Sequence, residues 1–128
     1  MEFNSLIPEL SVSNIETSRK FYEDIGFKLE YERKEDKFCF MSLEKNQIMI
    51  QEQNDNWTVG KMEYPFGRGI NISMRVKDVE KMYEALKQKN IKMYLDLEVH
   101  HYRADDTVYD DREFLIQDPD GYLLRFND

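Results

Sequence analysis

The chain has a single cysteine, no long apolar run and no basic leader, and each absence excludes something. One Cys among 128 residues cannot form a disulfide within the chain. Cys39 stands between Phe38 and Phe40, which predicts a small buried apolar group. No apolar run approaches the length of a membrane span, and the start lacks the basic and apolar regions of a signal peptide. We therefore expect a cytoplasmic protein that does not enter a membrane.

Positive charge is also scarce. Lys and Arg total 18 against 26 for Asp and Glu, so the net charge is -8. Such a surface repels nucleic acid and attracts cations. The apolar fraction of 41% and aromatic fraction of 13% are too high for a disordered chain. We expect one domain over residues 1–128, with a core of real size.

The second half of the sequence repeats the first. The segment Val12-Ser13-Asn14-Ile15-Glu16 returns 64 residues later as Val76-Lys77-Asp78-Val79-Glu80. Apolar residues alternate with polar ones over 6–12 and again over 70–76, which predicts a strand with one apolar face in each half. Leu6 and Ile70 are the first residues of the two predicted apolar faces. The repeat therefore predicts two copies of one structural module.

A helix is predicted directly after each of these strands. Ser13 and Glu16 fit a capping box at the first helix, and Asp78 is a good N-cap for the second. Gly26 and Asn90 stand at the two positions where the helices should end. The predicted inward stripes are Ile15, Ser18, Tyr22 and Ile25, then Val79, Met82, Tyr83 and Leu86.

Three strand-like segments follow each helix. They cover 27–33, 37–43 and 47–53 in the first half, and 91–99, 112–117 and 122–127 in the second. Lys45-Asn46 predicts a turn in the first half, and Asp118-Pro119-Asp120-Gly121 predicts one in the second.

The predicted fold is therefore α+β, with two tandem βαβββ modules. Module one covers about 1–53, a linker about 54–68, and module two about 69–128. Because each sheet has a helix on one face only, we expect a curved mixed sheet around a cavity, with the helices outside.

Strand alternation predicts which side chains face that cavity. Opposite the helix-facing side chains stand Glu9 in one half and Asn71, Ser73 and Arg75 in the other, with Arg125 on the last strand. Glu9 and Arg125 fit either a ligand contact or a rim charge that reaches water.

The pattern resembles the vicinal oxygen chelate superfamily, which includes glyoxalases, extradiol dioxygenases and bleomycin-resistance proteins. The resemblance covers nearly the whole chain. The segments that carry it are Ile7-Pro8-Glu9-Leu10-Ser11-Val12-Ser13-Asn14, Phe21-Tyr22, Ile25-Gly26-Phe27, Val76-Lys77-Asp78-Val79 and Asp118-Pro119-Asp120-Gly121-Tyr122.

The resemblance also implies where a metal would bind in the enzymes of this superfamily. The four ligand positions match Ile7, Met49, Asn71 and Arg125. Ile and Met are unsuited to a hard divalent ion, and Arg repels it. We therefore expect no metal and no other cofactor. The alternative is a glyoxalase- or dioxygenase-type enzyme with a displaced metal site, in which Glu9, Gln51 and a histidine converge, with or without an Asp.

The Ile7-Pro8-x-Leu10 opening and Arg112-Glu113-Phe114 resemble the bleomycin-resistance branch in particular. That branch implies a homodimer that sequesters a bulky cationic glycopeptide, such as an antibiotic, without chemistry. Five aromatic side chains could stack on a flat heterocyclic ligand: Tyr31, Phe38, Trp57, Tyr102 and Phe114. Each also fits the hydrophobic core, Phe114 especially. The predicted ligand-binding residues are Glu9, Tyr31, Phe38, Met49, Gln51, Trp57, Asn71, Ser73, Tyr102, Phe114 and Arg125.

Two other features carry less weight. His100 and His101 are adjacent, so on a strand they point to opposite faces and do not share one metal easily. We expect exposed or interface histidines. Asp105-Asp106 and Asp110-Asp111 match no EF-hand spacing, and we expect a solvated acidic loop there.

Overall fold

The computed structural model describes all residues, 1–128, and the chain forms two compact units. The first unit consists of Met1–Phe66 and Asp118–Asp120, and the second of Gly67–Gln117 and Gly121–Asp128. The main boundary between them falls inside the predicted linker, 54–68. The assignment of the turn at 118–120 to the first unit had no signal in the local sequence.

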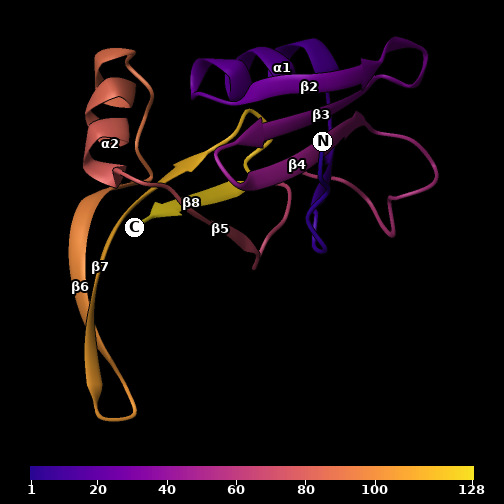
Figure 1. Cartoon of the computed structure of the whole chain (residues 1–128). Helices are drawn as coiled ribbons and strands as arrows, with labels where there is room; N and C mark the ends of the chain where they lie inside the picture. Colours follow the sequence, from indigo (N-terminus) through magenta and orange to yellow (C-terminus); the bar gives the residue numbers. More distant parts are fainter. The chain divides into compact units, whose positions relative to one another are not determined.

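The first unit contains a four-stranded mixed sheet in the order β1-β4-β3-β2 (Figure 1). β1 runs parallel to β4, and the other two pairs are antiparallel. Its elements are β1 (Glu9–Val12), α1 (Ile15–Asp24), β2 (Lys28–Arg33), a 3-10 turn η1 (Lys34–Asp36), β3 (Phe38–Leu43) and β4 (Asn46–Glu52).

The second unit repeats this arrangement with the order β5-β8-β7-β6, where β5 and β8 are the parallel pair. The predicted α+β class and the two βαβββ modules are therefore confirmed. The elements are β5 (Asn71–Arg75), α2 (Val79–Gln88), β6 (Leu95–Ala104), β7 (Thr107–Gln117) and β8 (Leu123–Asn127). Enclosure of one cavity by both modules stays a prediction.

Each helix is ten residues long, and neither is long or apolar enough to cross a bilayer. α1 begins one residue later than the capping box predicted, because Asn14 is the cap and its side chain accepts the Thr17 N–H at 3.0 Å. The Ser13 N–H instead donates to the Asp120 carboxylate. Asp78 caps α2 as predicted, and Gly26 and Asn90 take positive φ after the helices.

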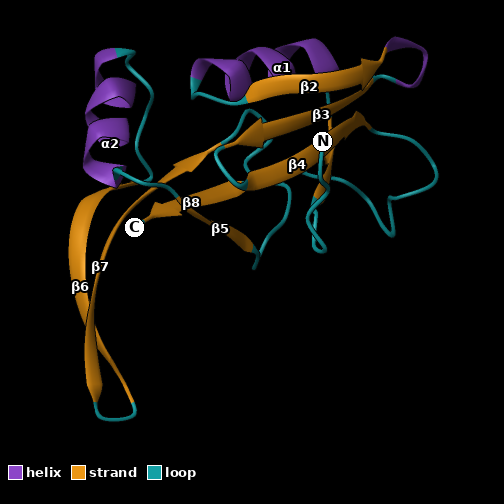
Figure 2. Cartoon of the chain, viewed as in Figure 1, coloured by secondary structure: helices purple, strands orange, loops and turns teal.

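One face of each sheet packs against the helix of its own unit. α1 lies on β2, β3 and β4, and α2 contacts β7 (Figure 2). The side chains that fill the first core include Leu10, Val12, Tyr22, Met41, Ile48 and Ile50; those of the second include Met74, Val76, Val79, Leu86, Phe114, Ile116, Leu124 and Phe126.

The ends of two predicted strands are wrong. Leu6 is 84% exposed and Ile70 is 62% exposed, so neither belongs to a core face. β1 pairs with β4 only from Glu9 onward, and β5 pairs with β8 only from Asn71 onward. In both segments the alternation begins before the first paired residue, where no neighbouring strand is present to form a core face. In the first-half turn, Glu44 rather than Asn46 takes the positive φ.

β6 and β7 form a longer hairpin than predicted. Their predicted segments, 91–99 and 112–117, become strands that reach Ala104 and begin at Thr107, around a turn at Asp105 and Asp106. Cross-strand pairs hold the extension together: the Tyr102 and Tyr109 rings stack at 5.5 Å, and His101 Nδ1 lies 2.5 Å from the Asp110 carboxylate.

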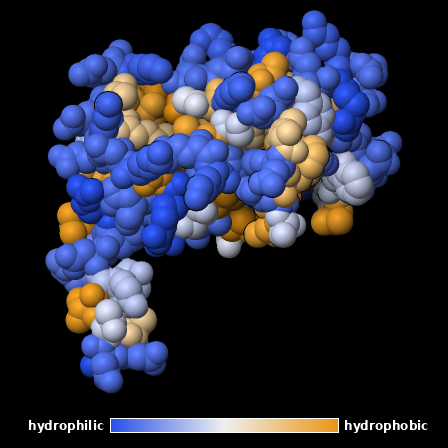
Figure 3. Space-filling view, viewed as in Figure 1, coloured by the Kyte–Doolittle hydropathy of each residue, from blue (hydrophilic) through white to orange (hydrophobic).

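The hairpin extends well past the other strands of its own sheet (Figure 1). Every residue from 101 to 110 is exposed, and hydrophobic side chains stand among hydrophilic ones at its end (Figure 3). The predicted acidic loop is therefore only half right, because Asp105 and Asp106 form the turn while Asp110 and Asp111 lie on β7.

A buried hydrogen-bond network fixes the turn at Asp118-Pro119-Asp120-Gly121. The fully buried Tyr22 hydroxyl donates to Asp118 Oδ2 at 2.7 Å, and the Asp120 N–H donates to Asp118 Oδ1 at 2.9 Å. Gly121 supplies the positive φ that the turn needs. The turn is where the sequence pattern predicted it; the Asp118 side chain stabilises it, and the Asp120 side chain accepts the Ser13 N–H.

The first prediction concerns Tyr22. Tyr22→Phe leaves a buried carboxylate without one donor, and we expect the free energy of unfolding in urea to fall by about 1.5–3 kcal/mol. Tyr83→Phe is the matched control, because the Tyr83 hydroxyl donates to Asp96 at the exposed surface. The control should change stability by less than about 0.5 kcal/mol. Equal losses in both variants would contradict a structural role for the buried bond.

Candidate functional site

The sheet faces that carry no helix hold most of the predicted site residues. In the first unit, the register aligns Glu9 with Met49, Met49 with Phe40, and Phe40 with Tyr31 across four strands. Directly paired residues share a face of the sheet, so these side chains form one row. The face opposite α1 is therefore rich in aromatic side chains.

Ring contacts stabilise this face. Tyr31 stacks on Phe40 at 5.2 Å with an interplanar angle of 8°, and the Arg33 guanidinium lies 4.0 Å above the Phe38 ring. The Trp57 indole N–H donates to Gln51 Oε1 at 3.1 Å. The face brings together six predicted site residues: Glu9, Tyr31, Phe38, Met49, Gln51 and Trp57.

These predicted site residues differ in how far their side chains are exposed to solvent. Phe38 is 3% exposed and packs within the unit, while Trp57 is 59% exposed in the segment that follows β4. Glu9 is half-buried at the start of β1, and burial raises the pKa of its carboxyl, an effect that the Arg33 charge partly opposes. The local surroundings thus disfavour the charged form of Glu9.

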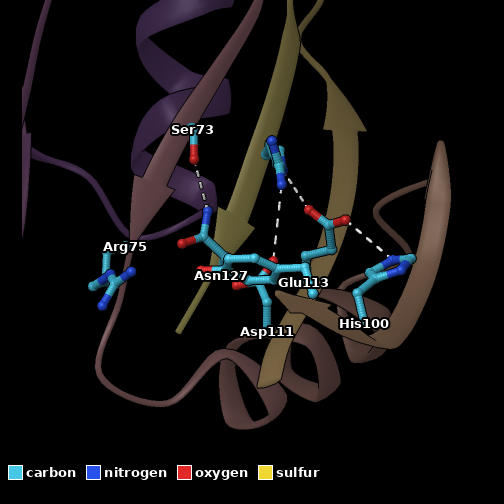
Figure 4. A pocket seen from close by; sticks show the side chains of 8 residues that line it. Ser73, Arg75, His100, Asp111, Glu113 and Asn127 are labelled. Carbon is cyan, nitrogen blue, oxygen red and sulfur yellow. Dashed lines mark hydrogen bonds and ion pairs between the residues drawn. The ribbon is translucent and has the colours of Figure 1, made fainter. Parts of the chain in front are cut away.

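The second unit has a hollow of about 480 Å³ on its helix-free face (Figure 4). Polar and charged side chains from all four strands converge on it, whereas the corresponding face of the first unit is aromatic. The lining residues are Ser73, Arg75, His100, Tyr102, Asp111, Glu113, Arg125 and Asn127.

Two carboxylates lie at the base of the hollow. The side chains of Asp111 and Glu113 are only 14% and 10% exposed. Arg125 Nε donates to Glu113 Oε2, and Arg125 Nη2 lies 3.8 Å from Asp111 Oδ2. The Arg125 side chain itself is 37% exposed. The negative charges are therefore fixed and enclosed, and their counter-charge is on the longer, more accessible side chain.

His100 completes this charge network from β6. Its Nε2 atom lies 3.1 Å from Glu113 Oε1 (Figure 4). The same atom lies 3.0 Å from Glu98 Oε2 on its own strand. The atom is buried and has no hydrogen-bond partner, so neither contact has the direction of a hydrogen bond. Nε2 therefore lies close to two carboxylates without a directed hydrogen bond to either.

The wall of the hollow combines amides, hydroxyls and rings. Asn127 Nδ2 donates to Ser73 Oγ at 2.9 Å, which fixes both side chains across the parallel β5–β8 pair. The half-exposed Tyr102 ring stacks on Tyr109 and extends the wall along the hairpin. The hollow can therefore offer carboxylates at its base and a flat aromatic surface beside them.

The remaining sequence predictions fall in three groups. Ser73, Tyr102 and Arg125 line the hollow, and Asn71 lies exposed on the same strand as Ser73. Phe114 lies on the opposite face, fully buried and stacked on Phe126 at 5.4 Å, so its core interpretation is the correct one.

Sequence reasoning missed three central residues. His100 had been expected as an exposed or interface histidine, Asp111 as part of a loop, and Glu113 only as part of a family motif. The alternation of His100 with Tyr102 was the available signal, and it acquired meaning only once β6 was known to reach Ala104. His100 and His101 do lie on opposite faces, as expected, with His101 paired to Asp110.

The residues at the superfamily's metal-ligand positions do not fit a metal. Ile7 and Met49 offer no hard ligand, and Arg125 is a cation bound to Glu113. No group of three or more His, Cys, Asp or Glu residues is arranged to hold a metal ion. Glu113, one of the carboxylates beside His100, is already paired with the Arg125 guanidinium.

A second hollow, of about 400 Å³, lies beside the start of α1 in the first unit. Its carboxylates already have partners: Glu52 accepts the Ile15 N–H, and Glu32 pairs with Arg19. Cys39 also lines it but is buried, as predicted, and burial raises the pKa of its thiol to about 11. The thiol is therefore protonated at neutral pH and a poor nucleophile.

Comparison with known proteins places this geometry in a family context. The sequence matches the profile of the glyoxalase/bleomycin resistance protein/dioxygenase superfamily over residues 5–126. A superfamily member from Vibrio splendidus 12B01 is 31% identical, with 93% of each chain covered and a TM-score of 0.43. No protein with a curated description matches the sequence.

Two further solved structures are similar in fold. A glyoxalase/bleomycin resistance protein/dioxygenase from Alicyclobacillus acidocaldarius is 21% identical, with 97% of this chain and 89% of that chain covered and a TM-score of 0.68. TioX from Micromonospora sp. ML1 is 14% identical, with 97% and 94% covered and a TM-score of 0.70. At these identities, the likeness shows the fold alone.

The second prediction follows from the raised pKa of Glu9. The protonated form is favoured on folding, so its contribution to stability is present at acid pH and is lost as pH rises through the folded-state pKa. Glu9→Gln should therefore raise the free energy of unfolding at neutral pH, by less than about 1 kcal/mol because the side chain is partly solvated. The gain should disappear in acid.

Thermal unfolding of the parent and of Glu9→Gln, measured from acid to neutral pH, tests this stability difference. Glu35→Gln, in the exposed η1 turn, is the control and should show no such pH-dependent gain. A Glu9→Gln variant that is less stable than the parent at neutral pH would mean that the charged form makes a favourable contact.

Proposed function

Because the chain belongs to the glyoxalase/bleomycin resistance protein/dioxygenase superfamily, whose shared fold does not fix one activity, we propose a function from the site itself. The protein is a metal-free binding protein that holds a small cationic, partly aromatic compound in the hollow of its second unit. The observation that carries the proposal is the enclosed Asp111–Glu113 pair beside the Tyr102–Tyr109 stack.

The charge arrangement favours a cationic ligand. The Asp111 and Glu113 side chains are barely exposed and both lie close to Arg125, so they remain at the base of the hollow. Arg125 reaches them from a long side chain that is more than one third exposed, and it can turn toward water without unfolding the strand. A ligand cation can then take its place between Asp111 and Glu113, so that neither carboxylate loses its counter-charge.

The ring wall favours a ligand that is also flat. Tyr102 is 50% exposed and Tyr109 is 46% exposed, and both belong to the part of the hairpin that no other strand covers. Aromatic rings that stack on each other present a preorganised surface for a third ring, and their faces attract cations. A compound with a ring next to its charge can use both features at once.

Three further features support binding of a cation rather than chemistry. The net charge of -8 draws cations toward the protein at long range. The one thiol is buried and protonated at neutral pH, and the superfamily's metal positions hold unsuitable residues. Sequestration of a cationic antibiotic is the version that the resemblance implies, and assembly as a homodimer stays a prediction with it.

The third prediction tests the carboxylate pair with benzamidine, an aromatic amidinium, as the probe. Calorimetry at low salt should detect saturable binding, with the same affinity in the presence of EDTA. Glu113→Gln removes the charge that the amidinium meets, and we expect a loss of at least about tenfold in affinity. Glu84→Gln, on the exposed surface of α2, changes the net charge equally and should bind as the parent does.

Similar losses in both variants would mean that only the net charge matters and that the hollow is not the site. An affinity that depends on EDTA or on added divalent ions would favour the metal-dependent enzyme instead.

The fourth prediction concerns Arg125, which competes with the ligand for Glu113. Arg125→Gln should raise the affinity for benzamidine several-fold, since one pair of charges no longer has to separate on binding. Arg103→Gln removes a charge from the exposed hairpin and should leave the affinity close to that of the parent. A marked loss of affinity in Arg125→Gln would instead make the guanidinium a direct ligand contact.

A further inference from the structure

A proton bound to a histidine in the hollow would compete with the ligand cation for the same negative charge, as Arg125 does. We propose that protonation of His100 opposes ligand binding, so that the hollow takes up its cationic ligand at neutral to alkaline pH and releases it in acid. The inference rests on the proposed function of the same hollow and adds how that binding is regulated.

The geometry around His100 Nε2 carries the inference. The atom lies within 3.1 Å of one carboxylate oxygen on β6 and another on β7, and it has no hydrogen-bond partner. A positive imidazolium at this point neutralises the same Glu113 carboxylate that we assign to the ligand cation. The proton and the ligand therefore contend for one negative charge.

The charged groups that line the hollow with His100, together with Glu98, fix the sign of the effect. Glu98 lies on its own strand, Asp111 and Glu113 on β7, Arg125 on β8 and Arg75 on β5, and Tyr102 is the neighbouring ring. Three carboxylates thus face two guanidinium groups, which leaves one net negative charge while His100 is neutral. Protonation of His100 brings the sum to zero.

Histidine is the side-chain type whose charge ordinarily changes between about pH 5 and pH 8. A proton on His100 places a positive charge within the ion-pair network and weakens the attraction for a ligand cation. By reciprocity, a cation that binds better when His100 is neutral favours the loss of that proton.

The chain supplies a matched control at the next position. His101 lies on the opposite face of β6, its side chain is 67% exposed, and it pairs with Asp110 outside the hollow. The two histidines are the only ones in the sequence. Any pH effect that depends on His100 but not on His101 therefore belongs to the hollow.

The experiment measures the dissociation constant of benzamidine at about pH 5.5 and about pH 8, a range in which histidine titrates while the amidinium stays charged. In the parent protein we expect binding to be roughly tenfold weaker at the lower pH, within the usual size of coupling between two ligands. His100→Gln should bind with nearly equal affinity at both values, and His101→Gln should behave as the parent.

A second readout follows the proton itself. Calorimetry in two buffers of different ionisation enthalpy should show that benzamidine binding near pH 6 releases protons from the parent protein and from His101→Gln, but not from His100→Gln. Thermal unfolding of the variants confirms that each is folded under the assay conditions.

The possible outcomes separate the two proposals. Benzamidine binding that is equally strong at both pH values overturns the role of His100 and leaves the proposed function standing. A pH dependence that survives in His100→Gln does the same, since another group would then titrate. Absence of binding to the parent at every pH overturns the proposed function, and the regulation with it.

Discussion

Each module has one helix for four strands, so only one face of its sheet can be covered within the module. Residues alternate between the two faces, and this divides every strand into side chains that pack on the helix and side chains that do not. Leu124 and Phe126 are fully buried in the core, while Arg125 between them reaches the hollow on the other face. The rest of the structure depends on this constraint, because the face without a helix is free to acquire a function.

The two modules carry different side chains on the face that has no helix. The register matches Met49 with Arg125 and Phe38 with Glu113, so an apolar position in the first module is a charged position in the second. The first face is closed by its own rings, with Phe3 packed edge-on against Phe40. The second face has no such cover, and its charges satisfy one another around a hollow.

Local rules predicted much of this structure. The 64-residue repeat, the Asp78 cap and the Asp118–Gly121 turn depend on neighbouring residues, and all were readable. Alternation could not show where Leu6 loses its neighbouring strand. Nor could it extend β6, because that extension depends on pairs such as Tyr102 with Tyr109, and such pairs are defined only once the register is known. His100 and Glu113 were missed for the same reason: their meeting is a property of strand pairing.

Placing charges rather than apolar side chains in the hollow has an energetic consequence. Enclosed carboxylates are costly unless they are paired, and Arg125 provides that pairing when no ligand is present. A ligand cation that replaces Arg125 exchanges one ion pair for another, so the cost of separating the Arg125 pair offsets part of the affinity that the new pair supplies. Ring stacking on Tyr102 and the return of Arg125 to water would supply the rest. The carboxylates would thus select a cationic compound, and the rings a flat one.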